Sequence, residues 1–576
     1  MRIALAQINS TVADFKGNSE KILAFARRAR DEQKADMVLF PELAVSGCPP
    51  LDLLGEKLFP ERSIQAVKNL ERELPHDIAV GFGYVSRSPC KTGKDLVNVY
   101  GIVLNGELVF EQIKTRLAPD GVYNEEQYFE PARSWDVFEY KKERLGFTIG
   151  EDLWQETNVP RPSYMKNPVP KLMDKGMSIL CVPSASPYAI RKYRSRLLLA
   201  AEISRAEDLP VVYINAAGAN DDVIFDGCSF VYTPAKPKRH PRTDESTLAL
   251  YAKPFEEDLV VWDTANVYRE SSKTGLDDTS DPFGVELSRY DLDMLEEALV
   301  LGIRDYMKKC GFSRAHTGLS GGIDSALVAY LAVRAAGAEN FTGISMPSRF
   351  SSPGSKDDAA ELAANLGCRY EVLPIEECYT AFLSTLKGIF ENRPFDITEE
   401  NIQARIRGLL NMAYSNKFNS MLLNTGNKSE IAMGYCTLYG DTNGALGPIG
   451  DIFKTEVFAL CRRINERSIA AGGKAIIPQA TIDKPPSAEL HPDQKDEDSL
   501  PPYDVLDAIL RLCLRGNRSP EEIVKEGWDR ELVKRIVKAI ARSEFKRRQL
   551  PPALRVSPGP FGAGRKIPVA RALYEI

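Results

Sequence analysis

Short apolar runs rich in β-branched residues dominate the chain up to about residue 265, with few helical segments between them. One segment, Ser19–Gln33, has apolar residues at the spacing of an amphipathic helix and lies between two such runs, which predicts a β-α-β start. Two later runs flank the dipeptide Asn105-Gly106, which favours a hairpin turn. Many strands with few helices indicate stacked sheets flanked by helices. The predicted strands are residues 1–8, 36–42, 77–85, 98–104, 107–114, 144–150, 178–184, 210–216 and 228–234.

From about residue 288 the pattern changes to apolar runs that alternate with helical segments, as in repeated β-α units. A helix is predicted over Asp324–Ala336, soon after the first of these runs. Such units form a parallel sheet, and ligands bind at the carboxyl ends of its strands. A polar, proline-containing segment, Ile482–Pro502, separates this sheet from further helices. The predicted strands are residues 314–320, 341–348, 369–375 and 420–426.

A polar, turn-rich stretch without a periodic apolar face, Asp263–Ser288, lies between the two patterns and indicates a linker or a wrapping segment. The chain has 576 residues, which is too long for one hydrophobic core. We therefore expect a first domain over residues 1–265, a linker over 266–287 and a second domain over 288–576.

Composition narrows the class of protein. The hydrophobic fraction of 43% and the charged fraction of 27% are typical of a soluble globular protein, and the net charge of −6 argues against a nucleic-acid or membrane partner. We expect neither a signal peptide nor a membrane span, because no long apolar run follows a basic start. The 10 cysteines lack zinc-type spacing and the 4 histidines are dispersed, so we expect reduced thiols in a cytoplasmic protein.

A glycine-rich stretch between a predicted strand and a predicted helix is the strongest candidate site. Adjacent glycines let the backbone wrap round a phosphate, and the new helix offers free N–H groups to it. No Walker-type lysine follows, which disfavours a motor that transfers the γ-phosphate. The stretch consists of Gly318, Leu319, Ser320, Gly321, Gly322, Ile323, Asp324 and Ser325.

The Ser-Gly-Gly-Ile-Asp-Ser part of this stretch resembles the pyrophosphatase loop of the ATP-pyrophosphatase family, which adenylates carboxylates. Downstream, the segment Thr425–Glu430 follows another predicted strand. Asp324 and Glu430 would each bring an oxygen ligand to the rim of the sheet, where a phosphate-bound Mg²⁺ would lie. A purely structural alternative for Glu430 is a carboxylate that interacts with a helix dipole.

Further motifs resemble the NAD synthetase family over about residues 288–549: Asn401–Gly408, Tyr439–Thr455, Lys484–Leu490 and Glu544–Gln549. The resemblance implies a Rossmann-like domain that uses ATP and Mg²⁺ to amidate deamido-NAD through an acyl-adenylate. It implies ATP contacts by the 318–325 loop, Thr425, Lys454 and Ser487, and deamido-NAD contacts by Asn401, Arg405, Glu430 and Lys546. The chemistry fits these residue types, because two anions must be brought together and only cations and amide donors favour that.

The first domain resembles the nitrilase superfamily, whose fold is an α-β-β-α sandwich. Glu42, in Phe40-Pro41-Glu42-Leu43, matches the general base of that family, and Lys114 matches its oxyanion lysine. The nucleophilic cysteine should precede Glu-Asp-Leu-Trp, but that position holds Gly150, which has no side chain to form a thioester. The family resemblance also implies remnants of a glutamine site at Asp120, where a tyrosine is expected, and at Ser186, Lys192, Asn215, Gly218 and 225–227.

These observations predict an ammonia-dependent amide ligase that carries a pseudo-glutaminase domain. The resemblance further implies a homo-oligomer built on a synthetase dimer. One alternative is glutamine-dependent synthesis at a rescued site, with Cys181 as the substitute thiol, although a strand cysteine is usually a buried apolar residue. A second alternative is a nitrilase-like scaffolding module. A tRNA-modifying ligase is disfavoured by the acidic charge.

Overall fold

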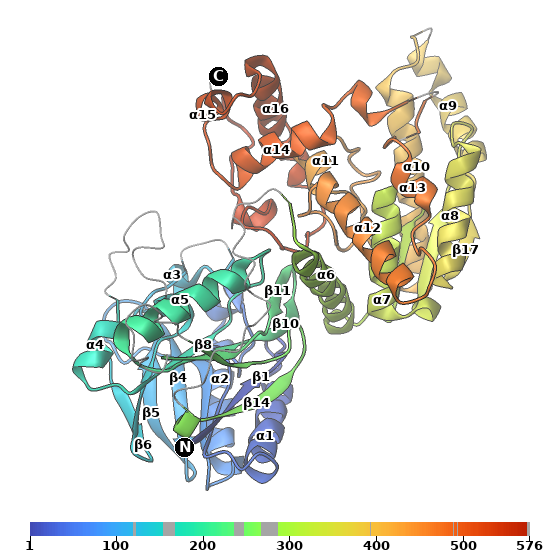
Figure 1. Ribbon diagram of the computed structural model, residues 1–576. Helices are drawn as coiled ribbons and strands as arrows, with labels where there is room; N and C mark the ends of the chain where they lie inside the picture. Colours follow the sequence, from blue (N-terminus) through green and yellow to red (C-terminus); the bar gives the residue numbers. More distant parts are fainter. Residues whose placement is uncertain are drawn as a thin grey trace. The chain divides into compact units, whose positions relative to one another are not determined.

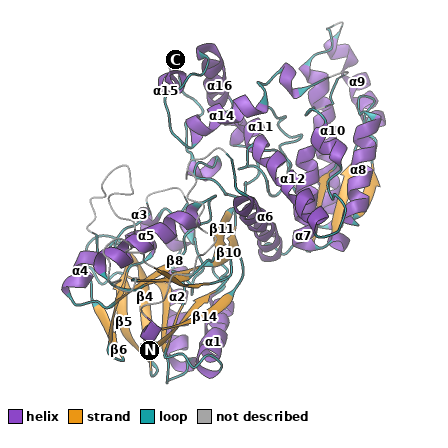
Figure 2. Cartoon of the chain, viewed as in Figure 1, coloured by secondary structure: helices purple, strands orange, loops and turns teal. Residues whose placement is uncertain are grey.

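The computed structural model describes residues 1–118, 122–153, 167–234, 247–266, 286–391, 393–487, 489–491 and 494–572. The chain forms two compact units, Met1–Pro282 and Phe283–Ile576. Most of the predicted linker, 266–287, lies outside the described residues. Figures 1 and 2 show that strands make up much of the first unit, whereas helices dominate the second.

The first unit contains two six-stranded sheets and a two-stranded ribbon. The first sheet has the order β14 (Asp258–Asp263), β1 (Arg2–Gln7), β2 (Met37–Leu39), β3 (Ala79–Arg87), β4 (Leu96–Leu104), β5 (Glu107–Ile113). The second sheet has the order β13 (Thr247–Tyr251), β12 (Phe230–Thr233), β9 (Val211–Asn215), β8 (Ile179–Ser184), β7 (Glu143–Phe147), β6 (Val137–Tyr140). The ribbon pairs β10 (Ala217–Asn220) with β11 (Val223–Asp226). The helices are α1 (Phe15–Asp31), α2 (Leu58–Glu73), α3 (Glu125–Tyr128), α4 (Val169–Asp174) and α5 (Lys192–Glu207).

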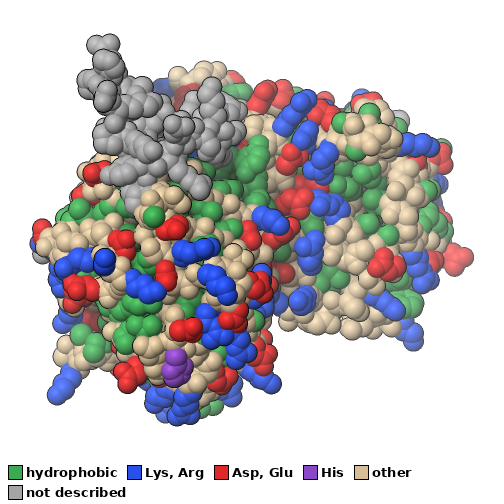
Figure 3. Space-filling model, turned by 60° about the horizontal axis from the view of Figure 1, so that its bottom comes forward, with side chains coloured by type: hydrophobic (Ala, Val, Ile, Leu, Met, Phe, Trp, Pro, Cys, Tyr) green, Lys and Arg blue, Asp and Glu red, His purple; other side chains and the backbone are tan. Residues whose placement is uncertain are grey.

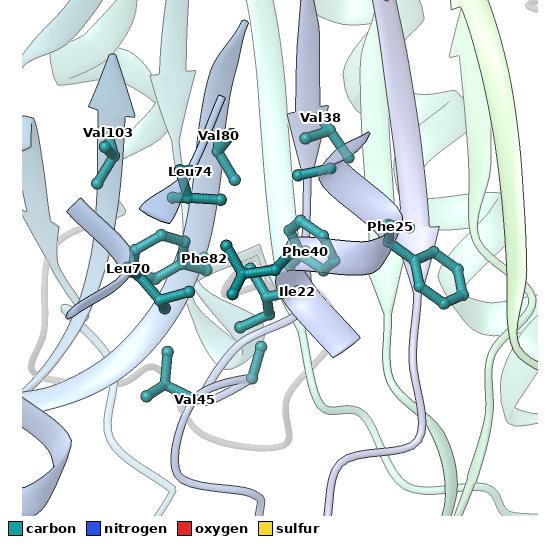
Figure 4. Close-up of a cluster of buried hydrophobic side chains, with 14 of the residues drawn as sticks. Ile22, Phe25, Val38, Phe40, Val45, Leu70, Leu74, Val80, Phe82 and Val103 are labelled. Atoms are coloured by element: carbon teal, nitrogen blue, oxygen red, sulfur yellow. The ribbon is translucent and has the colours of Figure 1, made fainter. Parts of the chain in front are cut away.

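The alternation of side chains along β1 explains why the sheets stack. Ala4 and Ala6 belong to a cluster shared with α1 and α2, in which Ile22, Phe40 and Phe82 are buried (Figure 4). Neighbouring β1 residues, such as Ile3 and Leu5, belong instead to a cluster shared by both sheets. Because β-strand side chains alternate between faces, β1 buries one face under helices and the other against the second sheet. Helix α5 packs against β9 and β12 on the second sheet, which completes the α-β-β-α sandwich expected of the nitrilase-like domain.

The second unit is built on a four-stranded parallel sheet with the order β17 (Arg369–Val372), β16 (Phe341–Ser345), β15 (Arg314–Gly318), β18 (Ser420–Leu422). Helix α7 packs against β15 and β16, and α10 packs against β15 and β18. This arrangement confirms the parallel-sheet domain inferred from the sequence. The helices are α6 (Arg289–Lys309), α7 (Ile323–Ala336), α8 (Pro353–Leu366), α9 (Glu376–Phe390), α10 (Ile397–Phe418), α11 (Lys428–Met433), α12 (Lys454–Ala470), α13 (Gln479–Asp483), α14 (Tyr503–Leu514), α15 (Pro520–Lys525), α16 (Arg530–Arg542) and α17 (Glu544–Arg547).

Two features of the first unit differ from the sequence-based expectation. Helix α1 begins at Phe15 rather than Ser19, because the Asp14 carboxylate caps it by accepting the Gly17 N–H. The strands β6, β10, β11, β13 and β14 were not predicted. Strand β14 pairs antiparallel with β1, although the two strands come from opposite ends of the first unit's sequence. Local periodicity carries no signal for a pairing between residues so far apart in the chain.

The surface carries charges of both signs, as the composition indicates. On the face in Figure 3, lysine and arginine side chains are intermixed with acidic ones over both units. None of the described helices combines the length and apolar character required to cross a membrane. All 10 cysteines are free thiols, five of them buried: Cys48, Cys181, Cys228, Cys461 and Cys513.

Candidate active sites

A cavity of about 320 Å³ lies in the second unit, next to the carboxyl ends of the parallel strands. Its lining includes residues of the loops after β15, β16 and β18, one face of α10, and the described residues Lys484, Pro485, Pro486, Ser487, Glu489 and Leu490. This is the edge at which doubly wound sheets bind ligands. The sequence-predicted residues that line it are Gly318, Leu319, Ser320, Gly322, Ile323, Asp324, Ser325, Thr425, Glu430, Lys454 and Ser487.

The glycine-rich loop after β15 owes its path to Gly321, the one residue of the 318–325 stretch that does not line the cavity. Gly321 has φ +78°, and a β-carbon there would lie 2.2 Å from the carbonyl oxygen of Ser355. Only glycine satisfies both conditions. Helix α7 then begins at Ile323, so its first backbone N–H groups face the cavity, as a phosphate site requires.

Three charged side chains from three helix starts meet at one wall of the cavity. The Lys454 ammonium lies 3.3 Å from a Glu430 carboxylate oxygen and also forms an ion pair with Asp324. The Asn427 side chain donates to Asp324 at 3.0 Å, and the Asn427 backbone N–H donates to Glu430 at 3.3 Å. Burial raises the pKa of Glu430 to about 8, and the Asp324 charge adds to that effect while Lys454 opposes it. The two carboxylates therefore share one rim, as the magnesium hypothesis requires.

Asp496 is a third carboxyl group of this wall that the sequence did not single out. One of its oxygens accepts the Tyr503 hydroxyl at 2.8 Å, and the other is buried without a hydrogen-bond partner. Burial raises the pKa of Asp496, whereas Lys454 acts in the opposite direction. Asp496 belongs to the polar segment Ile482–Pro502, so that segment contributes to the cavity rather than only separating it from the following helices.

The three residues implied in deamido-NAD binding besides Glu430 do not line the cavity. Asn401 accepts the Thr437 hydroxyl at 2.6 Å, and Arg405 donates to the Leu438 carbonyl at 3.2 Å. Lys546 donates to the Gly434 and Cys436 carbonyls at 2.8 and 2.7 Å. All three therefore hold the segment 434–438, whose Tyr435 and Cys436 do line the cavity.

Helix α10 contributes Arg407 to the cavity lining, and not Arg405, which was inferred from the sequence. Ala404, Arg407, Gly408 and Asn411 line it, at the i, i+3, i+4, i+7 spacing of a single helix face. Arg405 is exposed on another face. Burial lowers the pKa of Arg407 to about 10, an effect that Glu489 and Asp441 oppose. Helical spacing inside the Asn401–Gly408 motif was the signal that could have identified Arg407.

In the first unit, the structure brings Glu42, Lys114 and Gly150 together. The Lys114 ammonium donates to a Glu42 carboxylate oxygen at 2.7 Å. Gly150 has φ +50°, and a β-carbon built on it would lie 2.5 Å from Glu42 Oε2 and 3.2 Å from Lys114 Nζ. A side chain at position 150 would therefore start between the Glu42 carboxylate and the Lys114 ammonium.

Glu125 and Asn98 complete this buried site and were missed from the sequence. Lys114 donates to both Glu125 oxygens, at 2.9 and 2.7 Å, and the Asn98 amide donates to Glu42 at 2.8 Å. Burial alone would lower the pKa of Lys114, but the carboxylates of Glu125 and Glu42 outweigh it and raise that pKa. Burial raises the pKa of Glu125 to about 7, against the effect of Lys114. Glu125 begins the four-residue helix α3, which is too short to leave a periodic pattern, so the sequence held no local signal for it.

The predicted glutamine-site remnants are dispersed around this site. The Ser186 backbone N–H donates to the Asn215 side chain at 2.8 Å, and Asn215 donates to Asp226 at 3.0 Å. Lys192 is the first residue of α5. Asp120 lies outside the described residues.

Cys181, the alternative thiol, lies in the cluster between the two sheets rather than beside Glu42. It is fully buried in β8, and burial raises the pKa of its thiol well above the ordinary value. A protonated thiol in an apolar core is a poor nucleophile.

The fold and the loop after β15 place the second unit among the α/β enzymes that bind nucleotides at a sheet edge. Comparison with protein families matches residues 295–551 to NAD synthase and residues 2–235 to carbon-nitrogen hydrolase. A glutamine-dependent NAD(+) synthetase from Synechocystis sp. is 41% identical over 99% of both chains, and one from Rhodobacter capsulatus is 38% identical over 99% of this chain and 98% of its own. The chain belongs to the family of glutamine-dependent NAD synthetases, and it is an amide-forming ligase.

Solved structures agree over the whole length. The glutamine-dependent NAD+ synthetase from Acinetobacter baumannii, solved in complex with adenosine diphosphate, has 33% identity and a TM-score of 0.73, with 99% of this chain and 98% of that chain covered. The enzyme from Cytophaga hutchinsonii shares the fold, with a TM-score of 0.79 at 22% identity over 99% of this chain and 98% of its own.

Asp152 ties the Gly150 turn to the lysine segment, which generates a stability prediction. Its carboxylate accepts the backbone N–H groups of Thr115, Arg116 and Ile149, those of Thr115 and Ile149 at 2.9 and 3.0 Å. Asp152→Ala leaves these buried donors unsatisfied, so we expect the free energy of unfolding of the first unit to fall by about 3 kcal/mol or more.

Urea titration followed by tryptophan fluorescence measures this loss, because three of the 4 tryptophans precede residue 282. Asp152→Asn keeps one acceptor oxygen and should lose less. Glu151→Ala, at the half-buried neighbouring position, is the control and should leave the midpoint unchanged. Equal midpoints for Asp152→Ala and Glu151→Ala would contradict the structural role of Asp152.

Proposed function

We propose that this enzyme amidates deamido-NAD to NAD with ATP and Mg²⁺, and that it takes its nitrogen from free ammonia. We also propose the domain limits 1–265 and 288–576, with a linker over 266–287. The observation that carries the ammonia proposal is the Gly150 backbone, which faces Glu42 and Lys114 without a side chain.

The pseudo-glutaminase proposal rests on covalent chemistry. Release of ammonia from glutamine in a nitrilase-type site requires a thiolate that attacks the amide carbonyl and forms a thioester. Gly150 has no such atom, and Glu42 Oε2 reaches to 2.5 Å from the place where a β-carbon would be. Cys181, the alternative thiol named from the sequence, is buried in the apolar core between the sheets. The site therefore retains its base and its oxyanion lysine but has nothing for them to activate.

The second unit supplies a coherent set of groups for adenylation. The nicotinate carboxylate of deamido-NAD attacks the α-phosphorus of ATP, a C–O–P bond forms, and pyrophosphate leaves. Both reactants are anions, so the N–H groups of the 318–325 loop and the ammonium of Lys454 would stabilise the charge that develops. Neutral ammonia then attacks the acyl carbon and AMP leaves, with one proton released.

Asp324 and Glu430 fit a magnesium site. Mg²⁺ binds through one or two protein carboxylates plus water and substrate phosphates, and these two carboxylates already share the Lys454 ammonium at one rim. Among the described residues no cluster of three or more candidate ligands occurs, which suits a cation held mainly by phosphate and water. When bound, the cation would neutralise part of the triphosphate charge. Thr425 and Ser487 line the same cavity and would contact the triphosphate.

The remaining substrate contacts are proposed at the segment 434–438 and α10. Asn401, Arg405 and Lys546 hold that segment in place, and would therefore act on deamido-NAD through Tyr435 and Cys436. Arg407 lines the cavity directly and would be the nearer cation.

We further propose that two copies associate through α9 and α10. These helices pack together, and with their flanking residues they expose large apolar side chains. Ile389 is 75% exposed and Leu409 is 61% exposed. Several large exposed apolar side chains on two packed helices favour a protein–protein contact. The exposed set is Val372, Leu373, Phe382, Ile389, Phe395, Ile397, Leu409, Met412 and Phe418.

The ammonia proposal predicts a clear difference between nitrogen donors. Glutamine freed of ammonium should give no NAD above the background from contaminating ammonium, whereas ammonium salts should support full turnover. At subsaturating ammonium the rate should rise with pH through the range in which ammonium loses its proton, since only neutral ammonia is nucleophilic. The assay follows NAD and glutamate together, and equal amounts of both from glutamine would overturn the proposal.

Gly150→Cys provides the matched variant for that assay. The new side chain must displace the Glu42 carboxylate, which Asn98, Lys114 and the Ala185 N–H hold in place, so we expect only weak glutamate release. Adding Asp120→Tyr should increase it more than additively, because both changes serve one site. Efficient glutamine use by Gly150→Cys alone would show that position 120 is no obstacle.

The magnesium proposal predicts the effect of Glu430→Gln. The substitution keeps the shape but removes a ligand charge, so we expect turnover with saturating ammonium to fall at least about a hundredfold. The concentration of Mg²⁺ for half-maximal rate should rise as well. Glu497→Gln, an exposed change in the same polar segment as Asp496, is the control and should behave as the wild type. A wild-type rate for Glu430→Gln at all Mg²⁺ concentrations would refute the assignment.

The association proposal predicts a mass near twice 64.0 kDa for the wild type by light scattering coupled to size exclusion. Ile389→Glu with Leu409→Glu buries charge at the contact and should yield the single-chain mass. Leu198→Glu places the same charge on a 63% exposed leucine of α5 and should not change the mass of the particle. A wild type that runs as a single chain at high concentration would contradict the proposal.

A further inference from the structure

A second, separate cavity of about 150 Å³ lies in the second unit between α14, α15, α16 and residues 565–571. It shares no lining residue with the cavity at the sheet edge. Four arginines line it: Arg518, Arg547, Arg565 and Arg571. The proposed amidation uses none of these side chains, and of the four only Arg547 lies in a motif of the family resemblance, Glu544–Gln549.

Two of the four arginines already have partners. The Arg547 guanidinium contacts the Glu544 carboxylate at 2.9 Å and the Ala432 carbonyl at 3.0 Å, and it lies over the Phe561 ring. Arg518 is exposed and lies 3.9 Å from both Glu522 and Glu526, at the limit of an ion pair. Arg547 is therefore a fixed wall of the cavity, and Arg518 stands at its exposed side.

Arg565 and Arg571 are the unusual pair. Neither forms an ion pair with a carboxylate among the described residues, and Arg571 Nε is buried without a hydrogen-bond partner. Burial lowers the pKa of Arg565; Cys513 and the Glu544 carboxylate oppose that effect, and the positive charge of Arg571 adds to it. Two half-buried guanidinium groups that repel each other across a cavity are costly unless an anion lies between them.

The cavity selects the kind of anion by size and by donor geometry. Guanidinium groups bind phosphate oxygens through paired N–H donors, and arginine is the residue of choice for such recognition. The volume of about 150 Å³ lies below the roughly 300 Å³ at which pockets for drug-sized ligands begin, so a nucleotide does not fit. Glu544, the carboxylate nearest Arg547, is already held by Arg547 and Arg548, and the carboxylates of Glu522 and Glu526 lie at the exposed side beside Arg518.

We propose that this arginine cavity binds one small inorganic phosphate anion, either orthophosphate or pyrophosphate, independently of the ATP site. The anion would bridge Arg565 and Arg571, with Arg547 behind it. In doing so it would fix the segment that follows Gly564 against α14 and α16.

Equilibrium dialysis of the full chain with radiolabelled orthophosphate tests the proposal, at constant ionic strength and with a saturating non-hydrolysable ATP analogue present to fill the first cavity. We expect one equivalent of label to remain bound. Arg565→Gln with Arg571→Gln should weaken that binding at least tenfold. Arg535→Gln with Arg542→Gln removes the same charge from exposed positions of α16 outside the cavity, and should leave the binding unchanged.

Three further measurements keep the outcome decisive. Thermal unfolding without phosphate establishes that the double variants fold, and Arg565→Lys with Arg571→Lys, which keeps the charge but not the paired donors, should give intermediate binding. Pyrophosphate and unlabelled orthophosphate are then compared as competitors for the labelled site. The anion that displaces the label at the lower concentration is the one that the cavity prefers. Equal displacement by chloride, unchanged binding in Arg565→Gln with Arg571→Gln, or no binding to the wild type up to about 20 mM phosphate would each overturn the proposal.

Discussion

The charge cluster of Asp324, Glu430 and Lys454 is the interaction on which the second unit depends. Each residue lies in the first turn of a different helix, α7, α11 and α12. In a parallel sheet, the connections from strand to helix bring the starts of these helices to one edge of the sheet. There the positive ends of the helix dipoles would repel one another and the Lys454 ammonium. The two carboxylates offset that repulsion while no substrate is bound. Under the proposed function, the triphosphate of ATP would take over their part, and the two carboxylates would then be available to the proposed Mg²⁺.

The first unit contains a comparable cluster whose carboxylates are less exposed: the Glu42 and Glu125 side chains are 5% exposed, whereas those of Asp324 and Glu430 are 17% and 18% exposed. Lys114 is 3% exposed, and its ammonium contacts Glu42 and Glu125. Breaking such a buried pair by removing one partner typically costs about 3–5 kcal/mol, because the other charge stays buried without compensation. Both units thus hold a lysine between two carboxylates. In the second unit the trio borders a cavity open to substrate, whereas in the first it is packed against a glycine.

The sequence predicted the parts of the structure that local patterns encode. The four parallel strands, helix α7 and the glycine-rich loop all follow from periodicity and from glycine chemistry, and the loop does line the cavity. What it could not supply were contacts between distant segments, such as the pairing of β14 with β1 or the approach of Glu125 to Lys114. Motif resemblance also directed attention to Arg405, although the face of α10 that carries Arg407 borders the cavity. A motif marks a helix, but only the rotation of that helix against its sheet determines which residue reaches the ligand.

The first unit also explains how a site can outlast its chemistry. Glu42 accepts from Asn98, Lys114 and the Ala185 N–H, so its carboxylate satisfies three buried donors irrespective of any substrate. Lys114 in turn neutralises Glu42 and Glu125, and Asp152 holds the backbone of the Gly150 turn. Position 150, by contrast, makes no such structural contact. Its backbone requires φ +50°, which glycine adopts without strain. A glycine at position 150 therefore costs the fold nothing, whereas loss of Lys114 would leave Glu42 and Glu125 buried without their cation, and loss of Glu42 would leave the Asn98 and Ala185 donors without an acceptor. Under the pseudo-glutaminase proposal, these buried side chains keep their structural role although position 150 holds a glycine.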